Sequence, residues 1–264
     1  LALLVFAVAV WRFGPDWGAL LQEATHPAKP ATEGLPTYWY YAVALFGAAM
    51  TPYEVFFFSS GGVEEKWTAK DLATERVNVF VGFPLGGLLS LAIAASAALV
   101  LMPAGIEVDT LGQVALPVAD VLGRLGLAVV LIGFFAATFG AACETGLSVG
   151  YSVSQYFGWQ WGKYVQPRQA ALFHVLLLLS AITAVAVLLT TVDPIKVTEY
   201  SVVFSAVALP LTYFPILVVA NDPAYMGSKV NGRVGNALGT VYLVLVTLAS
   251  VAALPLMLLT KAGQ

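Results

Sequence analysis

The sequence predicts an all-α membrane protein. Hydrophobic side chains make up 59% of its 264 residues and charged side chains only 10%, whereas soluble domains carry about half and about a quarter respectively. The apolar residues form continuous runs of about 20 residues, the length of a helix that crosses roughly 30 Å of hydrocarbon. The runs do not alternate between apolar and polar residues, as the strands of a membrane barrel do. We therefore expect a bundle of membrane-spanning helices.

The apolar runs, taken in chain order, predict one transmembrane domain over residues 1–264. The first run is short, the second is interrupted at Pro52, and the fourth is long for one span and follows a short interfacial helix at about 116–125. The remaining runs have the length of ordinary membrane helices. The expected spans are 1–13, 38–60, 77–101, 125–156, 170–189, 201–220 and 238–259.

The first residues of the chain suggest that it is part of a longer protein. It begins at Leu1 without a methionine, inside an apolar run that lacks the charged start and cleavage site of a signal peptide. We expect an internal fragment whose earlier membrane helices precede Leu1.

The charged and reactive residues exclude several classes of function. A net charge of −3 without clustered Lys or Arg does not suit nucleic acid binding. The single Cys143 and the distant His26 and His174 do not form a thiolate or imidazole metal site. The chain contains no HExxH, GxSxG or Walker motif. We expect neither an enzyme nor a bound cofactor.

The most informative segment is the second span, FGAAMTPYEVFFFSSGGVEE. A proline in mid-span removes one amide donor, so carbonyls near Ala48 lose their helical partners at Pro52. Unwound backbone at membrane depth is tolerated when it is buried in protein or lines a cavity, and transporters hold cations at such breaks. Thr51, Tyr53 and Glu54 add side-chain oxygens within about one helical turn. A packing kink is the alternative for the proline alone, but a carboxylate inside a span favours an ion pathway.

Two further carboxylates belong to predicted spans. Glu144 lies among small residues in GAACETGLSVGYS, which favour close helix packing but do not explain an acid. A buried, protonated Glu144 that only accepts or donates hydrogen bonds is an equal alternative to a pathway role. Glu199 lies at the edge of the sixth span, where a solvated helix end is the competing interpretation. We include Glu144 and Glu199 among the candidate pathway residues.

These segments resemble the NRAMP family of divalent metal transporters. GAAMTPYEVFFFSSGGVEE is similar to the family's sixth helix, in a divergent bacterial branch that replaces the usual Met-Pro-His-Asn. EYSVVFSAVALPLTYFPILVVANDPAYMG resembles the tenth helix and its following loop, and the ETG segment falls in the eighth. The resemblance covers nearly the whole chain, from the end of helix five through helix eleven. It implies part of a LeuT-type fold with inverted repeats, in the inner membrane of a bacterium.

The resemblance also implies a set of metal ligands. Alignment on Pro52 puts the family's metal-binding carbonyl at Ala48 and its methionine position at Thr51, while Met50 falls one residue early. The two histidines linked to proton movement would fall on Tyr53 and Phe58, and the asparagine on Glu54. The family's Asp-Pro-Gly-Asn motif would precede Leu1. Because thioethers suit softer ions and oxygens suit harder ones, ion identity and proton coupling stay open.

The sequence therefore predicts a secondary transporter that moves a divalent cation of the manganese, iron or magnesium class by alternating access. The metal is the substrate, with proton symport and membrane lipid as further partners and no nucleic acid. The predicted ligands are Ala48, Thr51 and Glu54, and the predicted pathway also includes Met50, Pro52, Tyr53, Glu144 and Glu199. Two alternatives stay open, an amino-acid or amine transporter of the same architecture and a non-transporting membrane subunit.

Overall fold

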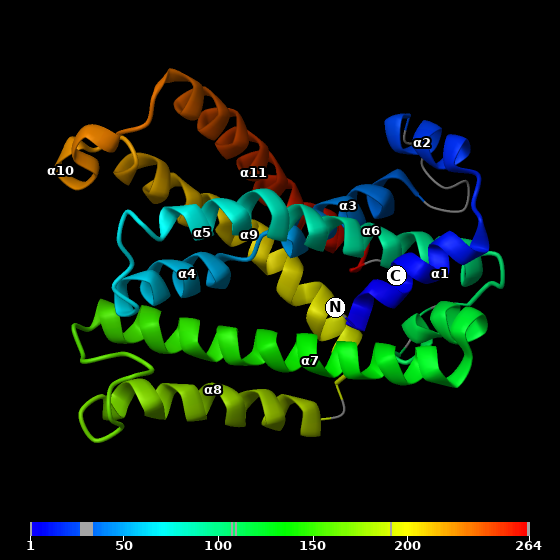
Figure 1. The fold of residues 1–264 in the computed structure, drawn as a ribbon, viewed down its shortest axis with the longest axis horizontal. Coiled ribbons are helices and arrows are strands. Elements are labelled where there is room, and N and C mark those ends of the chain that lie inside the picture. The colour runs from blue at the N-terminus through cyan, green and yellow to red at the C-terminus, as the bar shows by residue number, and fades with distance from the viewer. Residues whose placement is uncertain (1, 27–33, 107, 109, 191, 263–264) are drawn as a thin grey trace. The chain divides into compact units, whose positions relative to one another are not determined.

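The computed structural model describes residues 2–26, 34–106, 108, 110–190 and 192–262. Within these residues the chain is helical and contains no strand, which confirms the all-α class (Figure 1). Six helical stretches of the described residues are long and apolar enough to cross a membrane, with α3 and α4 counted together as Leu35–Glu64, and a shorter apolar helix covers Ala2–Phe13. The α-helices are α1 (Val5–Phe13), α2 (Trp17–Thr25), α3 (Leu35–Ala49), α4 (Pro52–Glu64), α5 (Leu72–Val77), α6 (Phe83–Val100), α7 (Leu116–Tyr156), α8 (Ala171–Leu189), α9 (Pro194–Val219), α10 (Pro223–Met226) and α11 (Arg233–Leu259).

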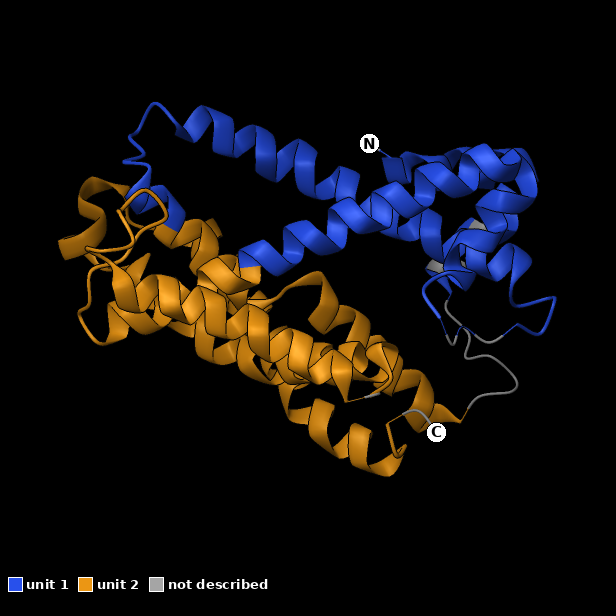
Figure 2. Ribbon diagram, turned by 90° about the horizontal axis from the view of Figure 1, so that it is seen from below, with its two compact units in different colours: residues 1–28, 61–144 blue, residues 29–60, 145–264 orange. Residues whose placement is uncertain are grey.

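The chain packs as two compact units, coloured separately in Figure 2. Unit 1 comprises residues 1–28 and 61–144, and unit 2 comprises residues 29–60 and 145–264. Helices α4 and α7 contribute residues to both units. The assignment of residues 1–264 to one transmembrane domain stays a prediction.

Unit 1 is built around the packing of α1 on α6 and on the start of α7. Its core consists of Phe6, Ala9, Ala115, Val118 and Val130, each fully buried. Within α7 the backbone leaves helical geometry at one residue, Gly123, where φ is 60°. A side chain is strained at this φ, so glycine allows the chain to turn from a short helix into the long one that follows.

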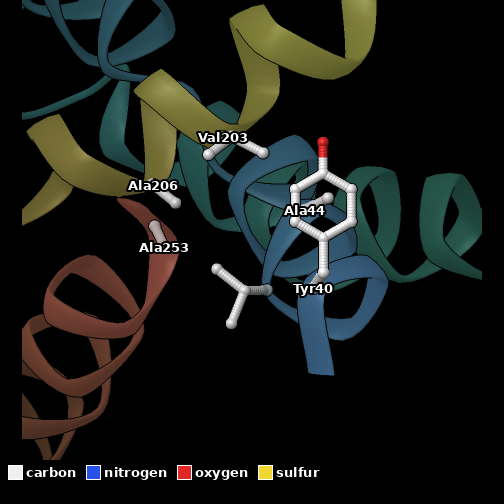
Figure 3. Close-up of a cluster of buried hydrophobic side chains, with 6 residues drawn as sticks. Tyr40, Ala44, Val203, Ala206 and Ala253 are labelled. Atoms are coloured by element: carbon white, nitrogen blue, oxygen red, sulfur yellow. The ribbon is translucent and has the colours of Figure 1, made fainter. Parts of the chain in front are cut away.

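Unit 2 contains α3, α9 and α11, which pack against one another. Their core includes Tyr40 and Ala44 from α3, Val203 and Ala206 from α9, and Ala253 from α11 (Figure 3). Small side chains predominate at this junction, and they permit close helix approach where lipid provides no hydrophobic driving force. The outward faces carry exposed Leu, Val and Phe side chains, as expected for surfaces in contact with lipid.

The second half of α7 packs on α8 within unit 2. Tyr151 and Phe173 are fully buried there with ring centroids 5.4 Å apart. A Cβ added at Gly150 would lie 2.8 Å from the Phe173 ring, so the glycine is needed for this close approach. Gly150 therefore serves helix packing, whereas a Cβ added at Gly140 would have no atom within 4 Å.

Candidate functional site

The second predicted span is broken just before Pro52, as the sequence predicts. Helix α3 ends at Ala49, α4 begins at Pro52, and Met50 between them has extended backbone with φ −143° and ψ 110°. Pro52 has no amide hydrogen to donate to the Ala48 carbonyl four residues earlier. The break therefore leaves the carbonyl end of α3 separated by two residues from the first turn of α4.

Thr51 lies in the break, and its hydroxyl is the most informative atom of the site. A threonine before Pro52 and three residues before Glu54 has the sequence of a capping box, in which the hydroxyl accepts an amide hydrogen. In the structure the Glu54 amide instead donates to the Thr51 carbonyl at 3.2 Å. The Thr51 hydroxyl oxygen is buried and has no hydrogen-bond partner. Capping therefore does not account for this hydroxyl.

The other two predicted ligands flank Thr51. Ala48 lies one residue before the end of α3, where the partial negative charge of a helix C-terminus favours a cation. Glu54 lies in the first turn of α4 and its side chain is half-buried. The break thus combines carbonyl, hydroxyl and carboxylate oxygens on adjacent turns, which are the donor types that hard divalent cations prefer.

A groove of about 540 Å³ runs along the start of α4 and the first half of α9. Pro52 and Tyr53 form its α4 side. Residues on one face of α9 form the other side, at spacings of three to four residues that place them on successive turns. They are Val197, Tyr200, Ser201, Phe204, Ser205 and Ala208.

Two side-chain hydrogen bonds hold α4 against the second half of α7. The buried Ser148 hydroxyl donates to the Tyr53 carbonyl at 2.9 Å. The Gln155 amide nitrogen donates to the Ser60 hydroxyl at 2.8 Å, two turns further along α4. These bonds fix the first turn of α4, which carries Glu54, to α7.

The end of α3 is held by a close approach to α9. A Cβ added at Gly47 would overlap the Val202 carbonyl oxygen and lie 2.9 Å from the Ala206 Cβ. Only glycine permits this spacing, and Gly47 immediately precedes Ala48. The position of the Ala48 carbonyl therefore depends on the α3–α9 contact.

The remaining predicted residues lie in different surroundings. The Met50 sulfur accepts a hydrogen bond from the Tyr242 hydroxyl of α11. Glu199 is half-buried in α9, but the groove is lined by the neighbouring Tyr200. Glu144 is the last residue of unit 1, whereas the break and the groove belong to unit 2. Within unit 2 the structure thus brings together the residues of the break and of α9.

Sequence reasoning missed two contributions to this site. Ser201 and Ser205 are polar residues four apart in an apolar span, a pattern that could have indicated a groove-lining face. Tyr242 carries no comparable signal, because a lone tyrosine in α11 says nothing about its contact with Met50. The described residues contain no cluster of three or more His, Cys, Asp or Glu side chains that could hold a metal. A cation at the break would depend on backbone and hydroxyl oxygens together with the single carboxylate of Glu54.

Comparison with known proteins identifies the family. Curated protein sequences give no significant match to the chain. The family model described as natural resistance-associated macrophage protein-like, or Nramp, matches residues 1–255. Since this match covers nearly the whole chain, the protein belongs to the Nramp family of integral membrane transporters, whose members move divalent metal ions.

Proposed function

We propose that the protein moves a divalent cation of the manganese, iron or magnesium class across the membrane by alternating access. The Ala48 carbonyl, the Thr51 hydroxyl and the Glu54 carboxylate bind the ion from the broken helix. The observation that carries this proposal is the buried Thr51 hydroxyl without a hydrogen-bond partner. The metal is the transported substrate, and the protein requires no cofactor.

The energetic cost of the break supports a bound ion. A buried polar group without a partner costs about 1–3 kcal/mol, and Pro52 deprives the Ala48 carbonyl of its helical donor as well. A cation between these oxygens would satisfy both, and Glu54 would offset part of its charge. A kink that served only packing would have no need of a carboxylate within the membrane.

The groove along α9 supports a route to the ion site. Pro52 and Tyr53 line the groove at the break, and the hydroxyl-bearing Tyr200 and Ser201 line it on α9. We assign Pro52 and Tyr53 to the ion pathway on this basis. Met50, Glu144 and Glu199 are proposed pathway residues from the sequence, to be tested one by one.

Metal uptake into proteoliposomes containing the full-length protein tests the ligand assignment. Thr51→Ala and Glu54→Gln should each weaken Mn²⁺ uptake by at least about tenfold in apparent affinity, which corresponds to about 1.4 kcal/mol. The matched controls are Thr138→Ala, whose hydroxyl bonds its own helix at 2.8 Å, and Glu75→Gln in α5. Uptake that is unchanged in the Thr51 and Glu54 variants would contradict the assignment.

The same vesicles separate the alternatives. Competition by divalent metals, with no effect of amino acids or amines, supports metal transport, and the opposite result supports an amino-acid or amine carrier. Absence of any flux together with a stable protein complex would indicate a non-transporting subunit. A pH-sensitive dye inside the vesicles tests proton symport, since coupled uptake acidifies the lumen as metal enters.

A further inference from the structure

Two side chains with metal-binding chemistry lie next to each other in the break, but their surroundings differ. The Thr51 hydroxyl is buried without a partner, whereas the Met50 sulfur accepts the Tyr242 hydroxyl hydrogen. A thioether is a weak hydrogen-bond acceptor and a soft metal ligand. Tyr242 of α11 thus bonds to the one soft metal-ligand atom in the break, the Met50 sulfur.

Tyr242 is itself held by a neighbouring aromatic ring. Its ring meets that of Tyr213 from α9 edge to face, with centroids 4.7 Å apart and planes at 72°. This geometry is the favourable one for an aromatic pair. A Cβ added at Gly239, three residues before Tyr242, would lie 3.4 Å from the Tyr213 hydroxyl and 2.8 Å from a Leu217 methyl. The close approach of α9 to α11 at Gly239 therefore sets the position of Tyr242.

We propose that Tyr242 is a positioning residue for ion selectivity, which holds the Met50 thioether against α11 so that the ion site contains oxygen ligands only. Methionine has three rotatable side-chain bonds and adapts readily to new surroundings. Without the Tyr242 hydroxyl, the Met50 sulfur can turn towards the break beside Thr51. The site would then gain a soft ligand and accept thiophilic ions such as Cd²⁺ more readily.

This inference rests on the proposed function, since it assumes that the break binds the transported metal. It adds a selectivity role for α11, a helix that contributes no ligand. It also explains why a methionine beside the ligand position need not make the site soft. The chemistry of the site depends on where the thioether is held and not only on its presence in the sequence.

The test compares Cd²⁺ and Mn²⁺ uptake by the full-length protein in proteoliposomes. Tyr242→Phe keeps the ring on Tyr213 and removes only the hydroxyl. The ratio of Cd²⁺ to Mn²⁺ uptake should rise about tenfold, at the lower end of the effects of residues that orient metal ligands. The double variant Tyr242→Phe/Met50→Leu should return to the wild-type ratio, and Tyr225→Phe in the exposed α10 should leave it unchanged. An unchanged ratio in Tyr242→Phe, or a raised ratio in the double variant, would overturn the proposal.

A second measurement separates this proposal from the proposed function. If the wild-type protein moves no divalent metal, the proposed function fails and the selectivity role fails with it. The contact itself is tested by thermal unfolding of the detergent-solubilised protein. The fall in midpoint caused by Tyr242→Phe should disappear when residue 50 is already leucine, because the hydroxyl then has no sulfur to bond. Additive effects of the two substitutions would refute the contact on which the proposal is built.

Discussion

Substitution of Gly47 by alanine should perturb the proposed ion site through helix packing alone. Gly47 lies against α9 one residue before Ala48, and its new methyl group would lie 2.9 Å from the Ala206 Cβ. Ordinary van der Waals contact begins at 3.4 Å, so this pair must separate by 3.4 − 2.9 = 0.5 Å. The Val202 carbonyl oxygen is closer still, and as backbone it cannot rotate away. The end of α3 must therefore move away from α9.

Two opposing terms determine the size of the effect. Alanine in place of glycine inside a helix stabilises it by about 0.5–1 kcal/mol. Overpacking of a close interface costs about 1–3 kcal/mol, and the upper half of that range applies because the contacted atom is backbone. We expect a net destabilisation of about 1–2.5 kcal/mol, together with displacement of the Ala48 carbonyl and about tenfold weaker Mn²⁺ binding.

Thermal unfolding in detergent and calorimetric Mn²⁺ titration measure the two consequences. The matched control is Gly87→Ala in α6, where an added Cβ has no atom within 4 Å and only the helix-propensity gain remains. Gly47→Ala should unfold at a lower temperature than the wild type, and Gly87→Ala at the same or a higher one. If Gly47→Ala matches Gly87→Ala in both stability and Mn²⁺ affinity, the packing account of the Ala48 position is wrong.

Two other substitutions test local hydrogen bonds. Ser148→Ala removes the donor to the Tyr53 carbonyl and should cost about 0.5–1.5 kcal/mol of stability. The thermal unfolding midpoint of Ser148→Ala should therefore be lower than that of the control Ser152→Ala. Equal midpoints would show that the hydrogen bond contributes nothing to stability. In the loop before α5, the amide and hydroxyl of Thr68 donate to Asp71 at 2.7 and 3.0 Å and hold the pKa of that carboxyl below its ordinary value of 3.8. Because the folded pKa is the lower one, these bonds stabilise the turn above pH 3.8 and are lost as the pH falls through the lowered pKa. The protection of the Thr68 amide against hydrogen exchange, relative to its intrinsic rate, should fall in that acidic range and lose this pH dependence in Asp71→Asn.

The helical class and the position of the break follow from local chemistry. A continuous apolar run of about 20 residues has one stable form in lipid, a helix that satisfies its own backbone. Pro52 lacks an amide hydrogen wherever it is placed, so the end of α3 near Ala49 could be predicted without any tertiary contact. The turn at Gly123 is likewise local, and it lies next to the boundary that the sequence predicts at about residue 125, between the interfacial helix and the following span.

The composition of the proposed ion site depends on contacts between residues far apart in the sequence. TPYE around Thr51 has the pattern of a capping box, and only the structure reveals that the hydroxyl is left without a partner. The sequence predicted Glu54 as a ligand and Met50, one residue before the ligand position, as a pathway residue. The Met50 sulfur is held by Tyr242, nearly two hundred residues later in the chain. This contact cannot be deduced from the sequence around Met50 or from the sequence around Tyr242.

The sequence by itself determined that this protein is an all-α membrane protein of the Nramp family with a helix broken at Pro52. The helical class and the break arise from hydrophobicity and backbone chemistry, which act over a few neighbouring residues, whereas the family follows from the match of its model to residues 1–255. The tertiary structure alone decided that Ser148 anchors α4, that Gly47 brings α3 against α9, and that Met50 turns to α11. Those outcomes depend on which helix faces meet, because a polar group in the membrane interior must find its partner on another helix when its own cannot supply one.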